Sequence, residues 1–150
     1  MRVVIQRVSE ASVSIHSEIK SSIEKGFLIL LGIHANDQLH DADWLIQKIC
    51  GLRIFSDADG KMNLSIKDVR GELLVVSQFT LFASTVKGNR PSFIQSAKPE
   101  IAVPMYEYFI QQLSINSGIQ VKTGEFGADM QVALVNDGPV TILIDSHNKE

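Results

Sequence analysis

Three polar side chains, Ser77, Gln78 and Thr80, follow directly on the apolar run of residues 73–76. Buried polar groups need hydrogen-bond partners, so polar residues at the end of a buried strand either meet solvent or line a site. A threonine hydroxyl becomes a nucleophile only beside a general base, and the sequence around Thr80 provides none. The pattern therefore leaves two interpretations open, a solvated strand end and a polar-lined pocket.

The dipeptide Gly138-Pro139 precedes a second apolar run, at residues 140–145, and also has two interpretations. Glycine and proline are typical of tight turns, and only about 5–6% of X-Pro bonds in folded proteins are cis. Composition alone therefore favours a trans turn that leads into a strand. Alternatively, this pair brings main chain close to a ligand, because glycine has no side chain to keep the ligand away.

The sequence offers few residues for metal binding or thiol chemistry. The histidines lack HxH and HExxH spacing, which argues against a metal site. They stand at His16, His34, His40 and His147. Asp57 and Asp59 of DADGKMN lack the terminal glutamate of a calcium loop, so we interpret them as a turn. The single cysteine, Cys50, excludes an internal disulfide and is expected to be an inert buried thiol. We expect neither a metal nor an organic cofactor.

The charge distribution differs from the overall charge. The chain has a formal net charge of −3, which gives no general attraction to nucleic acid. Residues 73–99, however, contain no acidic residue and carry Lys87, Arg90 and Lys98. Such a basic patch would bind phosphates in a salt-sensitive way. Surface charge that only aids solubility is an equally weighted alternative for these three residues.

Length and composition indicate one globular domain, taken as residues 1–150. Apolar residues make up 45% of the chain and charged residues 21%, which suits a packed core and not a disordered chain. No apolar run approaches the length of a membrane span, and the start MRVVIQRV lacks the apolar segment of a signal peptide. We therefore expect a cytoplasmic protein without membrane contact.

The hydrophobic pattern predicts eight strands, and the first two are expected to pair as a hairpin around Ser9-Glu10. The predicted strands are residues 3–8, 11–16, 26–33, 52–55, 72–82, 119–126, 130–135 and 140–145. Apolar residues at 3.6-residue spacing predict one helix around residues 42–52, with Asp37 as its cap. A second helix follows, and Pro104 favours a start near Ala102 or Val103 because proline is tolerated in a first turn. The predicted class is α/β, a single strand-rich domain whose packed sheets have two helices covering one face.

Two motifs together resemble the D-aminoacyl-tRNA deacylase family. They are SQFTL at residues 77–81 and NxGPVT at residues 136–141. Further stretches that look like this family are RVVIQRVSEASV, LRIFSDADGKMNLS, KGNRPSF and TGEFGADMQV. The resemblance covers nearly the whole chain and departures from it are few. Pro104 is one, at a place where the family usually has an ordinary helix former.

The resemblance implies an enzyme that hydrolyses the ester between a D-amino acid and the 3′ end of tRNA. It implies a homodimer in which Gly138-Pro139, joined by a cis bond, reaches into the active site of the other subunit. There the carbonyl oxygens of this pair would hold the substrate's ammonium group. Arg7 is expected to brace that loop, the SQFTL strand to form the pocket floor, and Phe126 and Met130 to lie beside it.

The chemistry of chiral proofreading suggests a mechanism for these residues. Backbone groups of the enzyme would contact only the ammonium, α-carbon and carbonyl that all substrates share. The side chain of an L-amino acid would then clash with the wall of the pocket. Glycine has no side chain to clash, so glycyl-tRNA, such as glycine mischarged on alanine tRNA, should also be hydrolysed. We assign oxyanion stabilisation to N–H groups in the catalytic segment, which comprises Ser77, Gln78, Phe79 and Thr80. The neighbouring ribose hydroxyl is the favoured activating group.

Two alternatives remain open at this point. One is an acyl hydrolase of small D-amino-acid esters that uses Thr80 as its nucleophile. The other is a non-enzymatic module that binds RNA or a small ligand in the same pocket. The sequence shows no RRM-like combination of aromatic and basic residues, which argues against a generic RNA binder.

Overall fold

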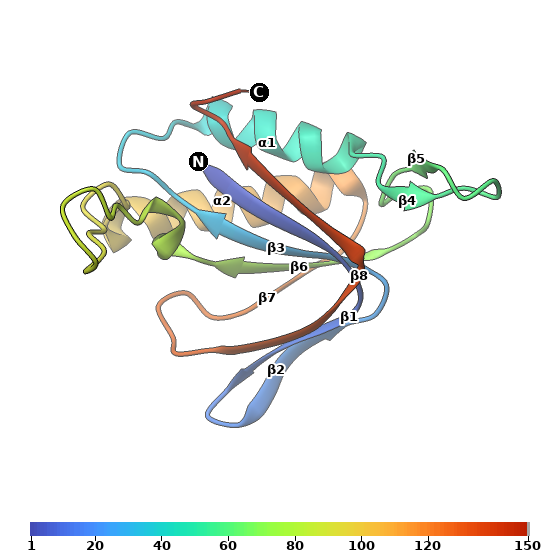
Figure 1. Ribbon diagram of the computed structural model, residues 1–150, viewed down its shortest axis with the longest axis horizontal. Helices are drawn as coiled ribbons and strands as arrows, with labels where there is room; N and C mark the ends of the chain where they lie inside the picture. The colour runs from blue at the N-terminus through green and yellow to red at the C-terminus, as the bar shows by residue number, and fades with distance from the viewer. Residues whose placement is uncertain (150) are drawn as a thin grey trace.

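The apolar run at residues 26–33 forms the central strand of a six-stranded sheet in the computed structural model, which describes residues 1–149 (Figure 1). The strands are β1 (Arg2–Ile15), β2 (Glu18–Ile23), β3 (Gly26–Gly32), β4 (Phe55–Ser56), β5 (Met62–Leu64), β6 (Glu72–Ser77), β7 (Val121–Thr123) and β8 (Gln131–Asp145). The helices are α1 (Leu39–Gly51), the 3₁₀ helix η1 (Phe79–Phe82) and α2 (Pro99–Ser117). The predicted α/β class, with about eight strands and two α-helices, is confirmed for these residues.

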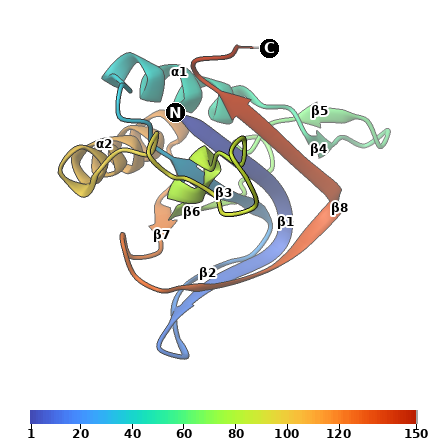
Figure 2. The same cartoon turned by 60° about the vertical axis from the view of Figure 1, so that its left-hand side comes forward.

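The large sheet has the order β2-β1-β3-β6-β7, and β8 pairs with β1 as well. β1 lies between β8 on one side and the consecutive strands β2 and β3 on the other, since Ala11 pairs with both Ile23 and Leu134. β3, β6 and β7 run parallel to one another, and β1 is antiparallel to its partners. Figure 2 shows that β1 and β8 bend together along their length.

Both helices cover the same face of the sheet, as the sequence predicts (Figure 2). Alternate side chains of β3, such as Phe27, Ile29 and Leu31, join the buried faces of α1 and α2 in one apolar cluster. The intervening Leu28 belongs to a second cluster on the opposite face. This burial on both faces explains why the β3 sequence is continuously apolar. In residues 1–149, neither α-helix is long and apolar enough to cross a membrane.

The hairpin predicted at Ser9-Glu10 is wrong, because β1 continues through these two residues. The pairing of β1 with β8 changes register between Val8 and Glu10, so the exposed Ser9 and Glu10 are accommodated by an irregularity and not by a turn. The real hairpin turn lies at His16 and Ser17, both of which have positive φ. β2 then pairs with β1, a strand that the polar sequence EIKSSI did not indicate.

The two strands predicted at residues 130–135 and 140–145 form a single strand, β8, which carries Gly138-Pro139 within it. The strand predicted at residues 72–82 ends at Ser77, after which the chain turns into η1. The strand predicted at residues 52–55 is shorter and lies later in the chain, at Phe55–Ser56. It pairs with Met62–Leu64 around the DADG turn, whose Asp57 carboxylate is satisfied by chain donors such as the Lys61 N–H.

Both predicted helix starts need correction. The helix α1 is capped by Gln38 and not by Asp37, whose carboxylate instead accepts hydrogen bonds from the Met1 ammonium and the His34 N–H. The helix α2 begins at Pro99, earlier than predicted, and Pro104 stays inside it on the exposed side. Proline at the first helical position favours initiation, and packing of the buried face offsets the cost of the internal proline.

Candidate active site

The SQFT segment lies where two parallel strands end. In the ladder between β3 and β6, Leu31 pairs with Ser77, so the carboxyl ends of both strands meet at one edge of the sheet. A cavity of about 280 Å³ opens at this edge. It is lined by Leu31, Ile33, Val76, Ser77, Gln78, Phe79, Ala97, Ala102, Phe126, Gly127, Ala128, Asp129, Met130 and Val132. Five residues singled out in the sequence therefore line a single cavity.

The main chain changes direction at Gln78. Its N–H donates to the Leu31 carbonyl oxygen at 2.8 Å and so extends the strand ladder by one bond. The next two N–H groups, of Phe79 and Thr80, begin η1 and donate no hydrogen bond to any described residue of the chain. The first N–H groups of a helix have no partner within it. Two main-chain donors are thus left at the turn that borders the cavity.

The Thr80 side chain lies outside the lining of the cavity. Its Oγ1 accepts a hydrogen bond from Nε2 of Gln78 at 2.5 Å, and the residue is exposed. Within residues 1–149, the Thr80 hydroxyl makes no hydrogen bond with an imidazole or a carboxylate that would act as a base. Covalent catalysis by this hydroxyl requires such a base. The side chain instead fixes the Gln78 amide.

The opposite wall of the cavity comes from the loop between β7 and β8. The Phe126 ring packs edge-on against Tyr106, with centroids 5.7 Å apart, and the Tyr106 hydroxyl donates to the Val75 oxygen. Burial raises the pKa of Tyr106 to about 12, so this phenol stays neutral. Met130 packs closely over Gly124, where an added Cβ would lie 2.5 Å from the methionine sulfur.

Asp129 is the one ionisable residue in the lining of this cavity. Sequence reasoning did not single it out, although it stands between Phe126 and Met130, which were both named. An exposed aspartate in a loop carries no signal of its own, and only its neighbours could have drawn attention to it.

Gly138 and Pro139 form an exposed turn within β8, and their peptide bond is cis. Gly138 has φ of 126°, and an added Cβ would lie 2.8 Å from Nη2 of Arg7 and 2.9 Å from the Val140 side chain. A side chain at this position would be strained and would clash. The Asn136 side chain closes the turn by accepting from the Val140 N–H at 3.1 Å.

Arg7 contacts this turn from β1, and its side chain is buried. Its Nε donates to the Asp137 carbonyl oxygen at 3.1 Å and lies 3.2 Å from the Asp137 carboxylate. Its Nη1 donates to the Ile54 oxygen at 2.6 Å. The arginine therefore joins the turn to the segment before β4.

The Gly138-Pro139 turn does not line the cavity of its own chain. It projects from the middle of β8, whereas the cavity begins at Met130 and Val132 near the start of that strand. The described chain therefore holds two separate groups of motif residues, one at the cavity and one on an exposed turn.

The three cations named from the sequence lie around the loop that joins η1 to α2. Lys87 and Arg90 are exposed in a small turn closed by the bridge between Ser84 and Ser92. Lys98 caps α2 and directly follows Ala97, a residue of the cavity lining. Lys98 is therefore the nearest of the three to the cavity along the chain.

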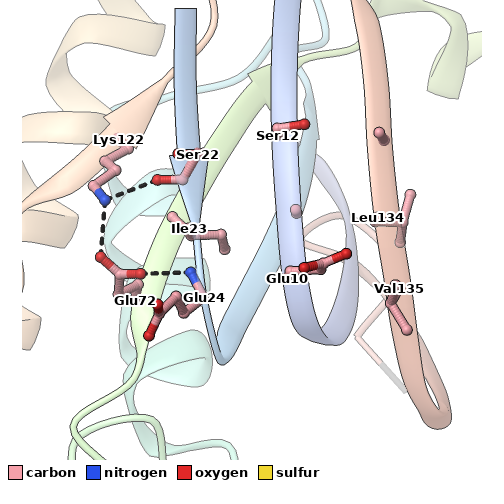
Figure 3. A pocket seen from close by; sticks show the side chains of 11 residues that line it. Glu10, Ser12, Ser22, Ile23, Glu24, Glu72, Lys122, Leu134 and Val135 are labelled. Carbon is pink, nitrogen blue, oxygen red and sulfur yellow. Dashed lines mark hydrogen bonds and ion pairs between the residues drawn. The ribbon is translucent and has the colours of Figure 1, made fainter. Parts of the chain in front are cut away.

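A larger groove of about 680 Å³ lies between β1, β2 and β8 and contains none of the SQFT or GP motif residues (Figure 3). In it, Lys122 bridges Glu72 and the Ser22 oxygen, each at 2.8 Å. The second Glu72 carboxylate oxygen accepts from the Glu24 N–H. These charged groups satisfy one another, and the groove offers no group prepared for acyl chemistry.

Comparison with a family profile and with curated proteins identifies one family. The sequence profile described as "D-Tyr-tRNA(Tyr) deacylase" matches residues 4–145. Proteins named D-aminoacyl-tRNA deacylase from Porphyromonas gingivalis and Phocaeicola vulgatus are 63% and 61% identical over 150 residues, which is the full length of both chains in each comparison.

Two solved structures are also similar. One, called "c-Myc DNA Unwinding Element Binding Protein", is 41% identical with a TM-score of 0.91 over 97% of this chain and 98% of that one. Another, described as a probable eukaryotic D-amino acid tRNA deacylase, shares the fold at 15% identity, with a TM-score of 0.82 over 95% and 97% of the chains. With its two motifs and its full-length relatives, the chain belongs to the D-Tyr-tRNA(Tyr) deacylase family of enzymes.

Proposed function

We propose that this deacylase hydrolyses the ester of D-aminoacyl-tRNA to the free D-amino acid and tRNA through main-chain groups and the substrate's own ribose. The observation that carries the proposal is the pair of unpaired N–H groups, of Phe79 and Thr80, at the edge of a cavity whose lining has one ionisable residue. Such donors stabilise the oxyanion that forms when an ester carbonyl is attacked.

Fewer N–H groups can stabilise the oxyanion than the sequence predicts. The Gln78 N–H is used by the Leu31 oxygen and cannot serve, which leaves the N–H groups of Phe79 and Thr80. Preorganised donors need no rearrangement during the reaction, and one such donor contributes about 10²–10³ in rate where it has been removed by mutation. The Gln78 and Ser77 side chains then shape the floor of the cavity.

The activating group is the hydroxyl next to the ester on the terminal ribose. This assignment is supported by the surroundings of Thr80, whose Oγ1 accepts from the Gln78 amide and has no base beside it. The aminoacyl ester is already reactive, so a positioned water and an oxyanion site suffice. Ser77, Gln78, Phe79 and Thr80 form the catalytic segment in this account, and no metal or organic cofactor takes part.

Chirality is read by the Gly138-Pro139 turn of a second copy of the chain. The turn is exposed, lies outside its own cavity and is held by Arg7, which leaves it available to a partner. Its carbonyl oxygens would accept from the substrate's ammonium group, beside Phe126 and Met130. With ammonium and ester both fixed, an L side chain would point into the wall, whereas a hydrogen atom would not. Glycyl-tRNA is therefore also a substrate in this proposal.

The tRNA binds through its phosphates to Lys87, Arg90 and Lys98, which surround the loop after η1. Phosphate contacts position a nucleic acid without reading its sequence, which suits an enzyme that accepts many tRNAs. A cytoplasmic homodimer acting on the 3′ end of charged tRNA is the assembly that these assignments require.

The decisive experiment compares deacylation of D-tyrosyl-tRNA, L-tyrosyl-tRNA and the ethyl ester of D-tyrosine by the purified protein. We expect rapid release from D-tyrosyl-tRNA alone. Rapid hydrolysis of the ethyl ester would favour a small-ester hydrolase, and binding of charged tRNA without hydrolysis would favour a non-enzymatic module. Equal rates for the D and L forms would disprove chiral selection.

A further inference from the structure

Arg2, at the start of β1, contacts the segment that carries the two unpaired N–H groups. Its Nε donates to the Asp145 carboxylate at 2.7 Å, and its Nη1 donates to the Leu81 carbonyl oxygen at 3.0 Å. The guanidinium carbon lies 4.6 Å from the centroid of the Phe82 ring. Leu81 and Phe82 are the last two residues of η1, so Arg2 holds the carboxyl end of this short helix.

The helix η1 also packs closely against the end of β3. An added Cβ at Gly32 would lie 3.0 Å from the Leu81 Cβ and 3.1 Å from the Gln78 carbonyl oxygen. A Cβ at this position would be closer to both atoms than normal van der Waals contact, so η1 packs directly on Gly32 and leaves no space there for a side chain. The hydrogen bond from Arg2 and the close packing on Gly32 therefore both act on the same four-residue helix.

The ion pair of Arg2 and Asp145 is not what holds β1 and β8 together. The ladder between these strands extends from Arg2 to Ser14, and the Ser146 N–H donates to the Met1 oxygen just beyond it. The chain end is thus already anchored beside the pair. Among residues 1–149, Arg2 alone donates a side-chain hydrogen bond to the Leu81 carbonyl oxygen.

We propose that Arg2, oriented by Asp145, is a positioning residue that sets the direction of the Phe79 and Thr80 N–H groups through η1. The inference rests on the proposed function, in which these groups stabilise the oxyanion. The helix η1 is one short 3₁₀ turn in which the Leu81 N–H donates back to the Gln78 oxygen, so a shift at Leu81 is passed on to the Phe79 and Thr80 peptide groups. Misplacement of a catalytic donor by about 1 Å can cost about 10²-fold in rate.

The variant Arg2→Lys separates this role from a purely structural one. A lysine ammonium can still pair with Asp145, but it cannot donate along two directions as the planar guanidinium does. We expect Arg2→Lys to keep the thermal midpoint of the wild type and to lower the single-turnover rate on D-tyrosyl-tRNA by about tenfold or more. The enzyme concentration at half-maximal rate should stay unchanged, because no substrate contact is lost.

The matched control is Lys122→Gln, which removes another ion pair between strands, with Glu72, in the groove away from the cavity. This variant should keep the wild-type rate. Asp145→Asn, which releases the Nε of Arg2 without changing side-chain size, should lower the rate in the same direction as Arg2→Lys. The effect of the double variant should be smaller than the product of the two single effects, because both act on one contact.

Amide chemical shifts of the isotope-labelled protein give a readout that does not depend on activity. The Phe79 and Thr80 amide resonances should move in Arg2→Lys and Asp145→Asn and should not move in Lys122→Gln. Wild-type rates in Arg2→Lys and Asp145→Asn, or unmoved Phe79 and Thr80 resonances, would overturn the positioning role. Absence of hydrolysis by the wild type would overturn the proposed function instead, while the resonances would still decide whether Arg2 orients the turn.

Discussion

Arg7 donates from β1 to the main-chain oxygen of Asp137, the residue that directly precedes Gly138-Pro139. The same side chain donates to the Ile54 oxygen, and only 8% of the residue is exposed. A single buried guanidinium thus sets the position of the exposed turn relative to the body of the protein.

Replacement of Arg7 by methionine should reduce both stability and activity. Two carbonyl oxygens, of Asp137 and Ile54, would lose their donor, which costs about 1–3 kcal/mol for a buried group left unpaired. Denaturant unfolding measures the first effect, and hydrolysis of D-tyrosyl-tRNA measures the second. Arg53→Met removes an exposed arginine close by and should leave both unchanged. Full activity of Arg7→Met would show that the turn needs no brace.

The Thr80 hydroxyl should be dispensable for chemistry. We expect Thr80→Ala to retain much of the deacylation rate, because the only hydrogen bond of Oγ1 within residues 1–149 is the one that it accepts from the Gln78 amide. D-aminoacyl-tRNA that lacks the ribose hydroxyl next to the ester should not be hydrolysed by the wild type. Single-turnover assays on both tRNAs test the two statements together. The reverse pair of results would support covalent catalysis by Thr80.

Glycyl-tRNA should be hydrolysed at a rate closer to that of the D substrate than to that of the L substrate. The expected reason is steric, since glycine has no side chain to meet the wall that excludes L residues. Initial rates on D-alanyl-, L-alanyl- and glycyl-tRNA, all with the same tRNA body, provide the comparison. A glycine rate as low as the L-alanine rate would rule out selection by clash.

The cations near the cavity should control the salt dependence of activity. Each phosphate contact contributes close to one unit of slope when the logarithm of affinity is plotted against the logarithm of salt concentration. Replacing Lys87, Arg90 and Lys98 together by glutamine should therefore lower this slope by up to about three units. Catalysis at saturating enzyme should change little. An unchanged slope would mean that these side chains only aid solubility.

Asp145 should contribute to acid stability. Burial acts to raise the pKa of its carboxyl, but hydrogen bonds from Arg2 and from the His147 N–H outweigh burial and lower it. The folded pKa is thus below the unfolded value of about 3.9. The stabilisation is present above that value and is lost as pH falls through the folded pKa. Asp145→Asn should reduce stability at pH 7 and flatten the acid limb, measured by denaturant unfolding across pH 2 to 7.

The sequence predicts the fold best where burial along a strand is uniform. It predicts the fold least well where exposed or turn-forming residues interrupt a strand. β3 is buried on both faces and is found within one residue of its predicted bounds. β1 and β8 were each divided in the prediction, because exposed residues such as Ser9 or a Gly-Pro pair usually mark turns. Here the register shifts in the ladder absorb these interruptions, and only the paired partner strand can reveal that.

The motifs predict the cavity but identify only some of the residues that line or support it. The motifs predict that Gln78, Phe126 and Met130 share one site, and all three line the cavity. Thr80 is predicted to join them but lies outside the cavity lining, because the strand ends at Ser77 and the Thr80 hydroxyl accepts a hydrogen bond from Gln78. Asp129 and the contact from Arg2 to Leu81 depend on three-dimensional proximity between distant segments, which no local pattern encodes.

Because β1 is one continuous strand, it also limits how a single ester could reach both the η1 turn and the Gly138-Pro139 turn. Arg2 holds the oxyanion turn and Arg7 holds the Gly138-Pro139 turn, and the two arginines are five residues apart on one extended strand. At about 3.3 Å per residue their Cα atoms are separated by roughly 17 Å. An amino acid's ammonium and carbonyl lie far closer than that, which fits the proposed dimer, in which each substrate meets the η1 turn of one chain and the Gly138-Pro139 turn of the other.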